Sequence, residues 1–117
     1  MRRVVVTGLG AVTPLGADVE KIWSDLLEGK SGAGSITRFD ASAMPCNIAC
    51  EVKKGDGSNG TFDAEAHLQA KEIRKVDPFI VFGVAAADKA IADAGIADLS
   101  EEEKLRAGVM IGSGIGG

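Results

Sequence analysis

Residues 77–87 read Asp77-Pro78-Phe79-Ile80-Val81-Phe82-Gly83-Val84-Ala85-Ala86-Ala87, and this stretch decides the fold. Aspartate is a favoured N-cap residue and proline fits the first helical position, so the pair predicts a helix that begins at Pro78. Residues 79–87 contain no charge, and Gly95 is expected to stop the helix. Because a helix that is apolar all round is buried on every side, the stretch predicts a fold with layers on both sides of it.

Two apolar segments near the ends of the chain predict strands. Residues 3–7 form a β-branched run that ends at Gly8 and Gly10, and residues 108–111 lead into a glycine-rich segment. A shorter strand is predicted near residues 48–52. The strand over residues 3–7 is expected to be an inner strand. The order of strands and helices predicts an α/β fold in which the first and last strands lie in one parallel sheet.

Three further segments have helical patterns. Asp18 is a good N-cap, Gly29 a good stop, and the apolar residues between them recur at helical spacing: Val19, Ile22, Trp23, Leu26 and Leu27. Residues 63–75 have helical composition, and residues 99–103 contain a capping box with an apolar residue ahead of it. The intervening residues 30–59 predict a long irregular connection, with an exposed turn over residues 55–60.

Composition limits the class of protein. The 117 residues are 45% hydrophobic and 26% charged, which is typical of one globular domain. A net charge of −4 argues against general affinity for nucleic acid, and no apolar run reaches the roughly 20 residues that span a bilayer. Cys46 and Cys50 lack the spacing and histidine partners of a zinc site, so we expect two buried or half-buried thiols in a reducing cytoplasm.

The last ten residues suggest that the chain is part of a longer protein. Residues 108–117 form an apolar strand that runs into Gly112-Ser113-Gly114-Ile115-Gly116-Gly117. Domains rarely end in such a segment, because termini usually lie in polar stretches with few contacts. Two or three strands are also too few to cover the predicted helices, so we expect the missing strands to follow residue 117.

Nucleotide binding and nucleophilic catalysis both lack support in this sequence. Residues 8–13 partly match the dinucleotide fingerprint, but its third glycine is replaced by Thr13, and Pro14 interrupts the helix that should follow. The only histidine, His67, lies in a polar helical stretch, where a solvated surface residue is expected. Neither cysteine has neighbours that would activate a thiolate. We therefore expect no cofactor and no metal.

Lys71, Arg74 and Lys75 place three cations on one face of the predicted helix. In a chain that is acidic overall, such a surface attracts an acidic partner. A solvated surface with part of its charge offset by Glu72 is the alternative, and the pattern by itself leaves both interpretations open.

The collinear set of motifs resembles the N-terminal part of β-ketoacyl-[acyl-carrier-protein] synthases, especially the type II elongation enzymes. The resemblance covers the whole chain in order, and it rests on these segments: Arg3-Val4-Val5-Val6-Thr7-Gly8-Leu9-Gly10, Thr13-Pro14-Leu15-Gly16, the Trp23 helix ending Leu26-Leu27-Glu28-Gly29-Lys30-Ser31-Gly32, Phe39-Asp40, Arg74-Lys75-Val76-Asp77 and Ile111 to Gly117.

The resemblance implies a fold and an activity. The fold would be a thiolase-like layered αβαβα arrangement, of which residues 1–117 form the N-terminal part of the first half and which is incomplete in this chain. The complete protein would be a cytoplasmic homodimer that elongates acyl chains in fatty-acid biosynthesis. It would accept an acyl chain from acyl carrier protein and condense it, with decarboxylation, with malonyl carrier protein.

The resemblance also assigns site residues. Lys71, Arg74 and Lys75 align with the basic helix that docks the acidic carrier protein, and Ile115 aligns with the apolar residue that gates the acyl pocket. The nucleophilic cysteine and two histidines of the family lie downstream of the glycine-rich segment. We therefore expect residues 1–117 alone to be inactive. The alternative is a non-catalytic carrier-docking module or a synthase homologue without the cysteine.

Overall fold

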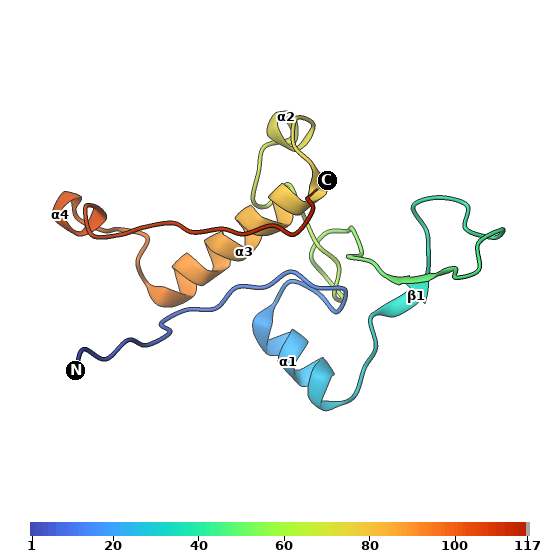
Figure 1. Cartoon of the computed structure of the whole chain (residues 1–117), viewed down its shortest axis with the longest axis horizontal. Coiled ribbons are helices and arrows are strands. Elements are labelled where there is room, and N and C mark those ends of the chain that lie inside the picture. The colour runs from blue at the N-terminus through green and yellow to red at the C-terminus, as the bar shows by residue number, and fades with distance from the viewer. Residues whose placement is uncertain (117) are drawn as a thin grey trace. The chain divides into compact units, whose positions relative to one another are not determined.

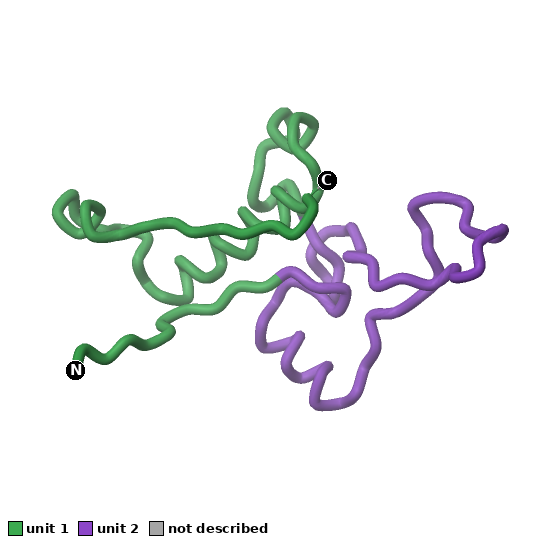
Figure 2. Tube along the Cα trace, viewed as in Figure 1, with its two compact units in different colours: residues 1–11, 64–117 green, residues 12–63 purple. Residues whose placement is uncertain are grey.

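The computed structural model describes residues 1–116 and divides the chain into two units. Unit 1 contains Met1–Ala11 together with the residues from Ala64 onward, and unit 2 is Val12–Asp63, as Figure 2 shows. Figure 1 labels most of the helices and strands. Unit 2 contains α1, β1 and β2, and unit 1 contains α2, α3 and α4.

Helix α1, Val19–Leu27, confirms the helix predicted in this region. The side chain of Asp18 caps it by accepting a hydrogen bond of 2.8 Å from the Lys21 backbone N–H. Gly29, with φ of 71°, takes the left-handed conformation that ends many helices. Ile22 is buried, and so is Asp25, a charged residue one turn further along the same face.

A two-stranded antiparallel hairpin follows α1. Strand β1, Ala33–Ser35, pairs with β2, Ile48–Cys50, in a register that sets Gly34 opposite Ala49. The strand predicted near residues 48–52 is therefore present and shorter, whereas β1 was not predicted. Its sequence, Ala-Gly-Ser, has little strand preference of its own and becomes a strand only through its partner.

The glycine-rich turn of unit 2 has the predicted geometry. Gly57, Asn59 and Gly60 have φ of 84°, 50° and 78°, a region that glycine and asparagine tolerate best. The turn is closed by a backbone hydrogen bond of 2.7 Å from Phe62 N–H to Lys53 O. Because Phe62 is only 3% exposed, this closure fixes the end of the turn.

Helix α3, Pro78–Ala94, is the longest element and has the predicted ends. Asp77 is its N-cap residue, Pro78 its first residue, and Gly95 adopts the left-handed conformation at its C-cap. The expectation of burial on every side is wrong for the described residues, because only Val81 and Ala85 are buried. Phe79 and Ile80 are each 39% exposed. The second layer inferred from the apolar sequence is not supplied by the described part of the chain.

Residues 8–10 cross α3 with unusually close backbone contact. A Cβ atom added at Gly10 would overlap the carbonyl oxygen of Ala86, and one at Gly8 would lie 2.5 Å from the backbone nitrogen of Ala94. The Leu9 backbone N–H donates a hydrogen bond of 2.8 Å to Asp93 Oδ2. These glycines therefore allow the chain to pack closely against α3.

The spacing of Gly8 and Gly10 along the extended chain matches the spacing of the alanines that they meet on α3. Ala86, Ala90 and Ala94 are four residues apart and so form one small-residue row on α3. Four helical residues rise about 6 Å, and two extended residues span about 6.6 Å. Glycines two apart can therefore meet alanines four apart, in opposite chain directions, as the contacts of Gly8 and Gly10 show.

The two strands predicted near the ends of the chain are absent from the described structure. Residues 3–7 and 108–111 are assigned to no strand, and the sheet of the described residues is the antiparallel β1–β2 pair. Val4 is 92% exposed and Met110 is 99% exposed. An apolar β-branched run becomes a strand only when a neighbour accepts and donates its backbone hydrogen bonds, and no described residue does so here.

The two short helices of unit 1 differ in how well they were predicted. Helix α4, Glu101–Lys104, confirms the capping box, since the Ser100 backbone N–H donates a 2.8 Å hydrogen bond to Glu103 Oε2. Helix α2, Ala70–Ile73, is much shorter than the helix expected over residues 63–75, because turns precede it from residue 64. No helix in the described residues has the length and apolarity needed to cross a membrane.

Candidate functional site

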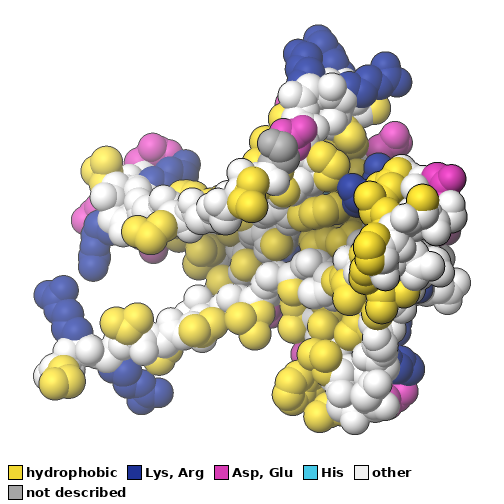
Figure 3. Space-filling view, turned by 45° about the vertical axis from the view of Figure 1, so that its right-hand side comes forward, with side chains coloured by type: hydrophobic (Ala, Val, Ile, Leu, Met, Phe, Trp, Pro, Cys, Tyr) yellow, Lys and Arg dark blue, Asp and Glu magenta, His cyan; other side chains and the backbone are white. Residues whose placement is uncertain are grey.

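The exposed basic surface on the α2 segment is the first candidate site. We call Lys71, Arg74 and Lys75 the basic surface. All three are exposed, and Figure 3 shows Lys and Arg side chains gathered at the top of the view, over this segment. Backbone hydrogen bonds from Arg74 to Ala70 and from Lys75 to Glu72 continue the turn past the end of α2. The predicted clustering is therefore present, although only four residues form the helix.

Glu72 does not neutralise the basic surface. Its carboxylate turns back to the start of α2, where Oε2 accepts a hydrogen bond of 3.4 Å from the Gln69 backbone N–H. Within the described part of the chain, none of the three cations of the basic surface forms an ion pair. The surface therefore presents three uncompensated positive charges in a chain of net charge −4.

Ile115 lies in the glycine-rich segment of unit 1 and is fully exposed, at 102% of its reference area. Gly112 and Gly114 have open space around them, whereas Gly116 lies against the ring of Phe79. The described residues thus place no pocket wall around Ile115. Its role in an acyl pocket stays a prediction.

The cysteines and His67 are not organised for catalysis. Cys46 and Cys50 are free and exposed, so the expectation that they are buried or half-buried is wrong. His67 lies in a turn and its side chain is only 16% exposed, so it is not the solvated helix residue expected. Its Nδ1 is 3.2 Å from Asp88 Oδ2. Among the described residues, no group of acidic, histidine and cysteine side chains could hold a metal ion.

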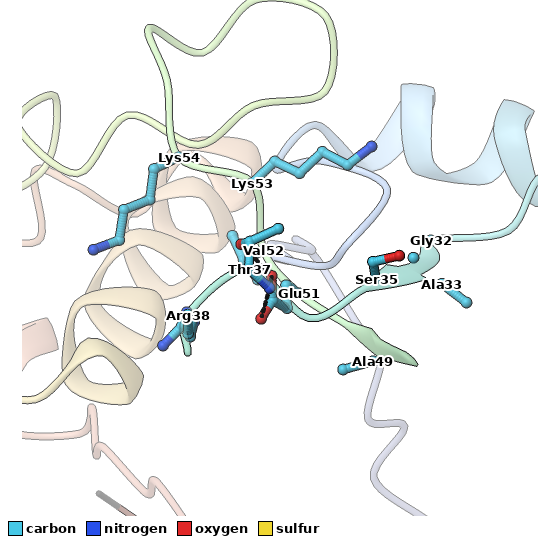
Figure 4. A pocket seen from close by; sticks show the side chains of 11 residues that line it. Gly32, Ala33, Ser35, Thr37, Arg38, Ala49, Glu51, Val52, Lys53 and Lys54 are labelled. Atoms are coloured by element: carbon cyan, nitrogen blue, oxygen red, sulfur yellow. Dashed lines mark hydrogen bonds between the residues drawn. The ribbon is translucent and has the colours of Figure 1, made fainter. Parts of the chain in front are cut away.

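A cavity of about 430 Å³ lies beside the β1–β2 hairpin and was not predicted (Figure 4). Its lining includes Thr37, Arg38, Glu51, Lys53 and Lys54. The Glu51 carboxylate accepts hydrogen bonds of 2.7 Å from Thr37 Oγ1 and 3.2 Å from the Thr37 backbone N–H. The hydrogen bond from the Thr37 hydroxyl, with smaller help from the backbone N–H, holds the pKa of Glu51 below its ordinary value of 4.5 because these donors stabilise the ionised carboxylate.

The buried carboxylate of Asp25 organises a second cluster in unit 2. Lys21 Nζ lies 2.6 Å from Asp25 Oδ2 and Lys30 Nζ lies 2.7 Å from Oδ1, so each carboxylate oxygen holds one ammonium group. Hydrogen bonds from Lys21 and Lys30 lower the pKa of Asp25 from its ordinary value of 3.8. Bonds to Asp25 and then Glu28 raise the pKa of Lys30 from 10.5 to about 12. The i,i+4 spacing of Lys21 and Asp25 was the feature of the sequence from which part of this cluster could have been predicted.

The Asp25 cluster predicts how stability depends on pH. Because the pKa of Asp25 is lowered on folding, its stabilisation is present above 3.8 and is lost as pH falls through the folded value. Because the pKa of Lys30 is raised, its stabilisation is present below 10.5 and is lost as pH rises through about 12. We expect Asp25→Asn to lower the free energy of unfolding at pH 7. It should also reduce the loss of stability at acidic and at alkaline pH, as measured by urea unfolding across pH.

Glu28→Gln is the matched control for this prediction. Glu28 also binds Lys30, at 2.9 Å, but its side chain is 58% exposed. Exposed ion pairs contribute little, so this variant should keep nearly the same pH profile as the unmodified protein. Equal effects of the two substitutions would contradict a special role for the buried carboxylate.

Comparisons with known proteins cover the whole chain. The family model described as "Beta-ketoacyl synthase, N-terminal domain" matches residues 1–117. The chain is 53% identical over 117 residues to 3-oxoacyl-[acyl-carrier-protein] synthase 2 of Rhizobium meliloti (strain 1021), covering all of this chain and 28% of that protein. It is 49% identical over 116 residues to the synthase of the same name from Coxiella burnetii, and this match covers 99% of this chain and 26% of that protein.

A solved structure supports the same relationship. The chain resembles a protein described as the ishigamide ketosynthase/chain length factor, with a TM-score of 0.68 and 35% identity. The match covers 87% of this chain and 23% of that chain. Together with the family model, it confirms the predicted fold class, the N-terminal part of a thiolase-like layered α/β fold. The chain spans about a quarter of the length of the curated relatives it matches.

Proposed function

This chain belongs to the β-ketoacyl synthase family, as its N-terminal domain, and from that premise we propose that the full-length protein is a 3-oxoacyl-[acyl-carrier-protein] synthase. The protein would elongate acyl chains in fatty-acid biosynthesis by decarboxylative condensation with malonyl carrier protein. The observation that supports this most strongly is the identity of 53% over every residue of the chain. The acyltransferase chemistry would use a cysteine and two histidines located after residue 117.

Residues 1–117 would contribute recognition to this reaction, as the N-terminal part of the first thiolase-like half. The basic surface would dock acyl carrier protein, loaded with either the acyl or the malonyl group, because an acidic partner is attracted by three uncompensated cations. Ile115 would line the acyl pocket, where an aliphatic side chain among glycines can change position. The complete enzyme would act as a homodimer in the cytoplasm.

Two alternative functions are less well supported. A non-catalytic docking module, or a homologue without the cysteine, would share the basic surface. The relatives with 53% and 49% identity are both named as synthases, which favours the catalytic interpretation. Condensation by the full-length protein would separate the alternatives directly.

Substitution of Ile115 tests the proposed function and the role of this residue together. We expect the full-length protein to condense acyl carrier protein with malonyl carrier protein and to release carbon dioxide. Ile115→Phe should shift products toward shorter chains, because a larger ring fills part of an apolar pocket. Mass spectrometry of the carrier-bound products measures both results.

Ile48→Phe is the matched control, because Ile48 is also an exposed isoleucine but lies in β2. It should leave the product lengths unchanged. Absence of condensation would overturn the proposed function. Condensation with unchanged product lengths in Ile115→Phe would instead overturn only the role of Ile115.

A further inference from the structure

A second, smaller cavity in unit 2 is lined by lysines from separate segments. It has a volume of about 210 Å³ and is distinct from the basic surface, which lies in unit 1. We call it the Lys53 cavity. Its lining residues come from the loop before α1, from α1 and its C-terminal end, and from the segment around the glycine turn, and they include Leu15, Lys21, Asp25, Lys30, Lys53 and Gly60.

Backbone contacts fix the frame of the Lys53 cavity. The loop before α1 is closed by reciprocal hydrogen bonds between Thr13 and Gly16, of 2.7 and 2.9 Å. A Cβ atom added at Gly60 would lie 2.9 Å from the carbonyl oxygen of Leu15, so the turn and the loop are in close contact. Because backbone atoms form these contacts, the loop before α1 and the glycine turn are held close together beside the cavity.

The buried carboxylate of Asp25 holds two of the lysines in place. Lys21 and Lys30 bind different oxygens of this carboxylate, whose side chain is only 8% exposed. An ammonium group has three N–H donors, and Asp25 uses one from each lysine. Lys30 uses a second donor for Glu28. Two N–H donors of Lys21 and one of Lys30 therefore remain for a ligand.

Lys53 supplies a third ammonium group from another segment. In Figure 4 its side chain extends toward the pale blue ribbon of the α1 segment, whereas the side chain of Lys54 extends in the opposite direction. Lys53 forms no ion pair with another described residue. The lining thus contributes three lysines and one carboxylate, and with the Glu28 carboxylate beside Lys30 the local charge is still positive, which favours an anion.

We propose that the Lys53 cavity binds a phosphate group. Three lysines from two sides give donors in several directions, which suits a tetrahedral dianion better than a planar, singly charged carboxylate. The volume of about 210 Å³ is larger than a phosphate group, so the cavity has room both for the free ion and for the atoms next to a terminal phosphate. The ligand is therefore inorganic phosphate or the terminal phosphate of a phosphomonoester.

Calorimetric titration of the full-length protein tests this proposal. Sodium phosphate is compared with sodium acetate at equal ionic strength, and glycerol 3-phosphate serves as the phosphomonoester. We expect phosphate to bind more tightly than acetate, and Lys53→Met to weaken phosphate binding about tenfold. Binding of glycerol 3-phosphate assigns the site to phosphomonoesters, and its failure to bind assigns the site to the free ion. Either result supports the proposal.

Lys54→Met is the matched control, because it removes the same charge from the neighbouring residue whose side chain extends away. It should leave phosphate binding unchanged. Circular dichroism and the urea midpoint establish that both variants are folded. The proposal is overturned if phosphate does not bind at millimolar concentration, if acetate binds as tightly, or if the two lysine variants weaken binding equally.

Discussion

Replacing Gly10 by alanine is expected to destabilise the protein by about 3 kcal/mol, the upper end of the usual cost of overpacking, because the added atom meets backbone and not a flexible side chain. The added Cβ would overlap the carbonyl oxygen of Ala86 and lie 2.8 Å from the backbone nitrogen of Ala90. Both atoms belong to the middle of α3 and cannot move without disturbing that helix. Urea unfolding, followed by circular dichroism, measures the change.

The same geometry predicts that removing the Ala86 side chain will not rescue Gly10→Ala. Ala86→Gly removes a side chain, but the overlap involves the Ala86 backbone, so the double variant should remain as unstable as the single one. Gly34→Ala is the matched control. Gly34 has nothing within 4 Å of an added Cβ, and surface changes of this kind stay within about 0.5 kcal/mol. Rescue by Ala86→Gly would show that the contact is not made through the backbone.

Reversing the basic surface is expected to weaken association with acyl carrier protein about 100-fold at low ionic strength, since attraction between complementary surfaces becomes repulsion. The variant carries Lys71→Glu, Arg74→Glu and Lys75→Glu. All three residues are exposed and unpaired within the described structure, so their substitution should not alter the fold. Surface plasmon resonance with immobilised carrier protein measures the affinity.

Salt and a charge-matched variant distinguish docking from general repulsion. Because exposed charges are screened beyond about 8 Å at physiological ionic strength, the unmodified protein should lose affinity as salt rises, and the reversed variant much less. Reversal of Lys54, Lys104 and Arg106 changes the net charge equally but lies outside the basic surface. An equal loss of binding in this control would mean that net charge, and not the basic surface, governs association.

The helix ends of this protein were predictable because their signals are local. Asp18, Pro78, Gly95 and the Ser100–Glu103 capping box each act within one helical turn, and each occupies its expected position. The terminal strands were not predictable in the same way. A strand depends on hydrogen bonds from residues far along the chain, and residues 3–7 and 108–111 have apolar composition without such partners in the described structure.

The candidate sites also differ in whether they depend on local contacts or on contacts between distant residues. The basic surface was predicted, because residues three and four apart on one turn are neighbours whatever the rest of the fold does. The Asp25 cluster was not, since the contact with Lys30 and the approach of Lys53 depend on how α1 and the glycine turn are positioned. The roles of Gly8 and Gly10 were also hidden, because a glycine in a sequence does not reveal which backbone approaches it.

The extended segments 3–7 and 108–111 have a consequence for the order of folding. Each presents apolar side chains and backbone groups without partners among the described residues, which is the arrangement that recruits a neighbouring strand. The source of the strand that pairs first decides whether the chain folds correctly or aggregates. In a protein as long as the relatives, that strand would come from the same chain. At high protein concentration the strand would come from another copy of the chain, and aggregation would compete with folding.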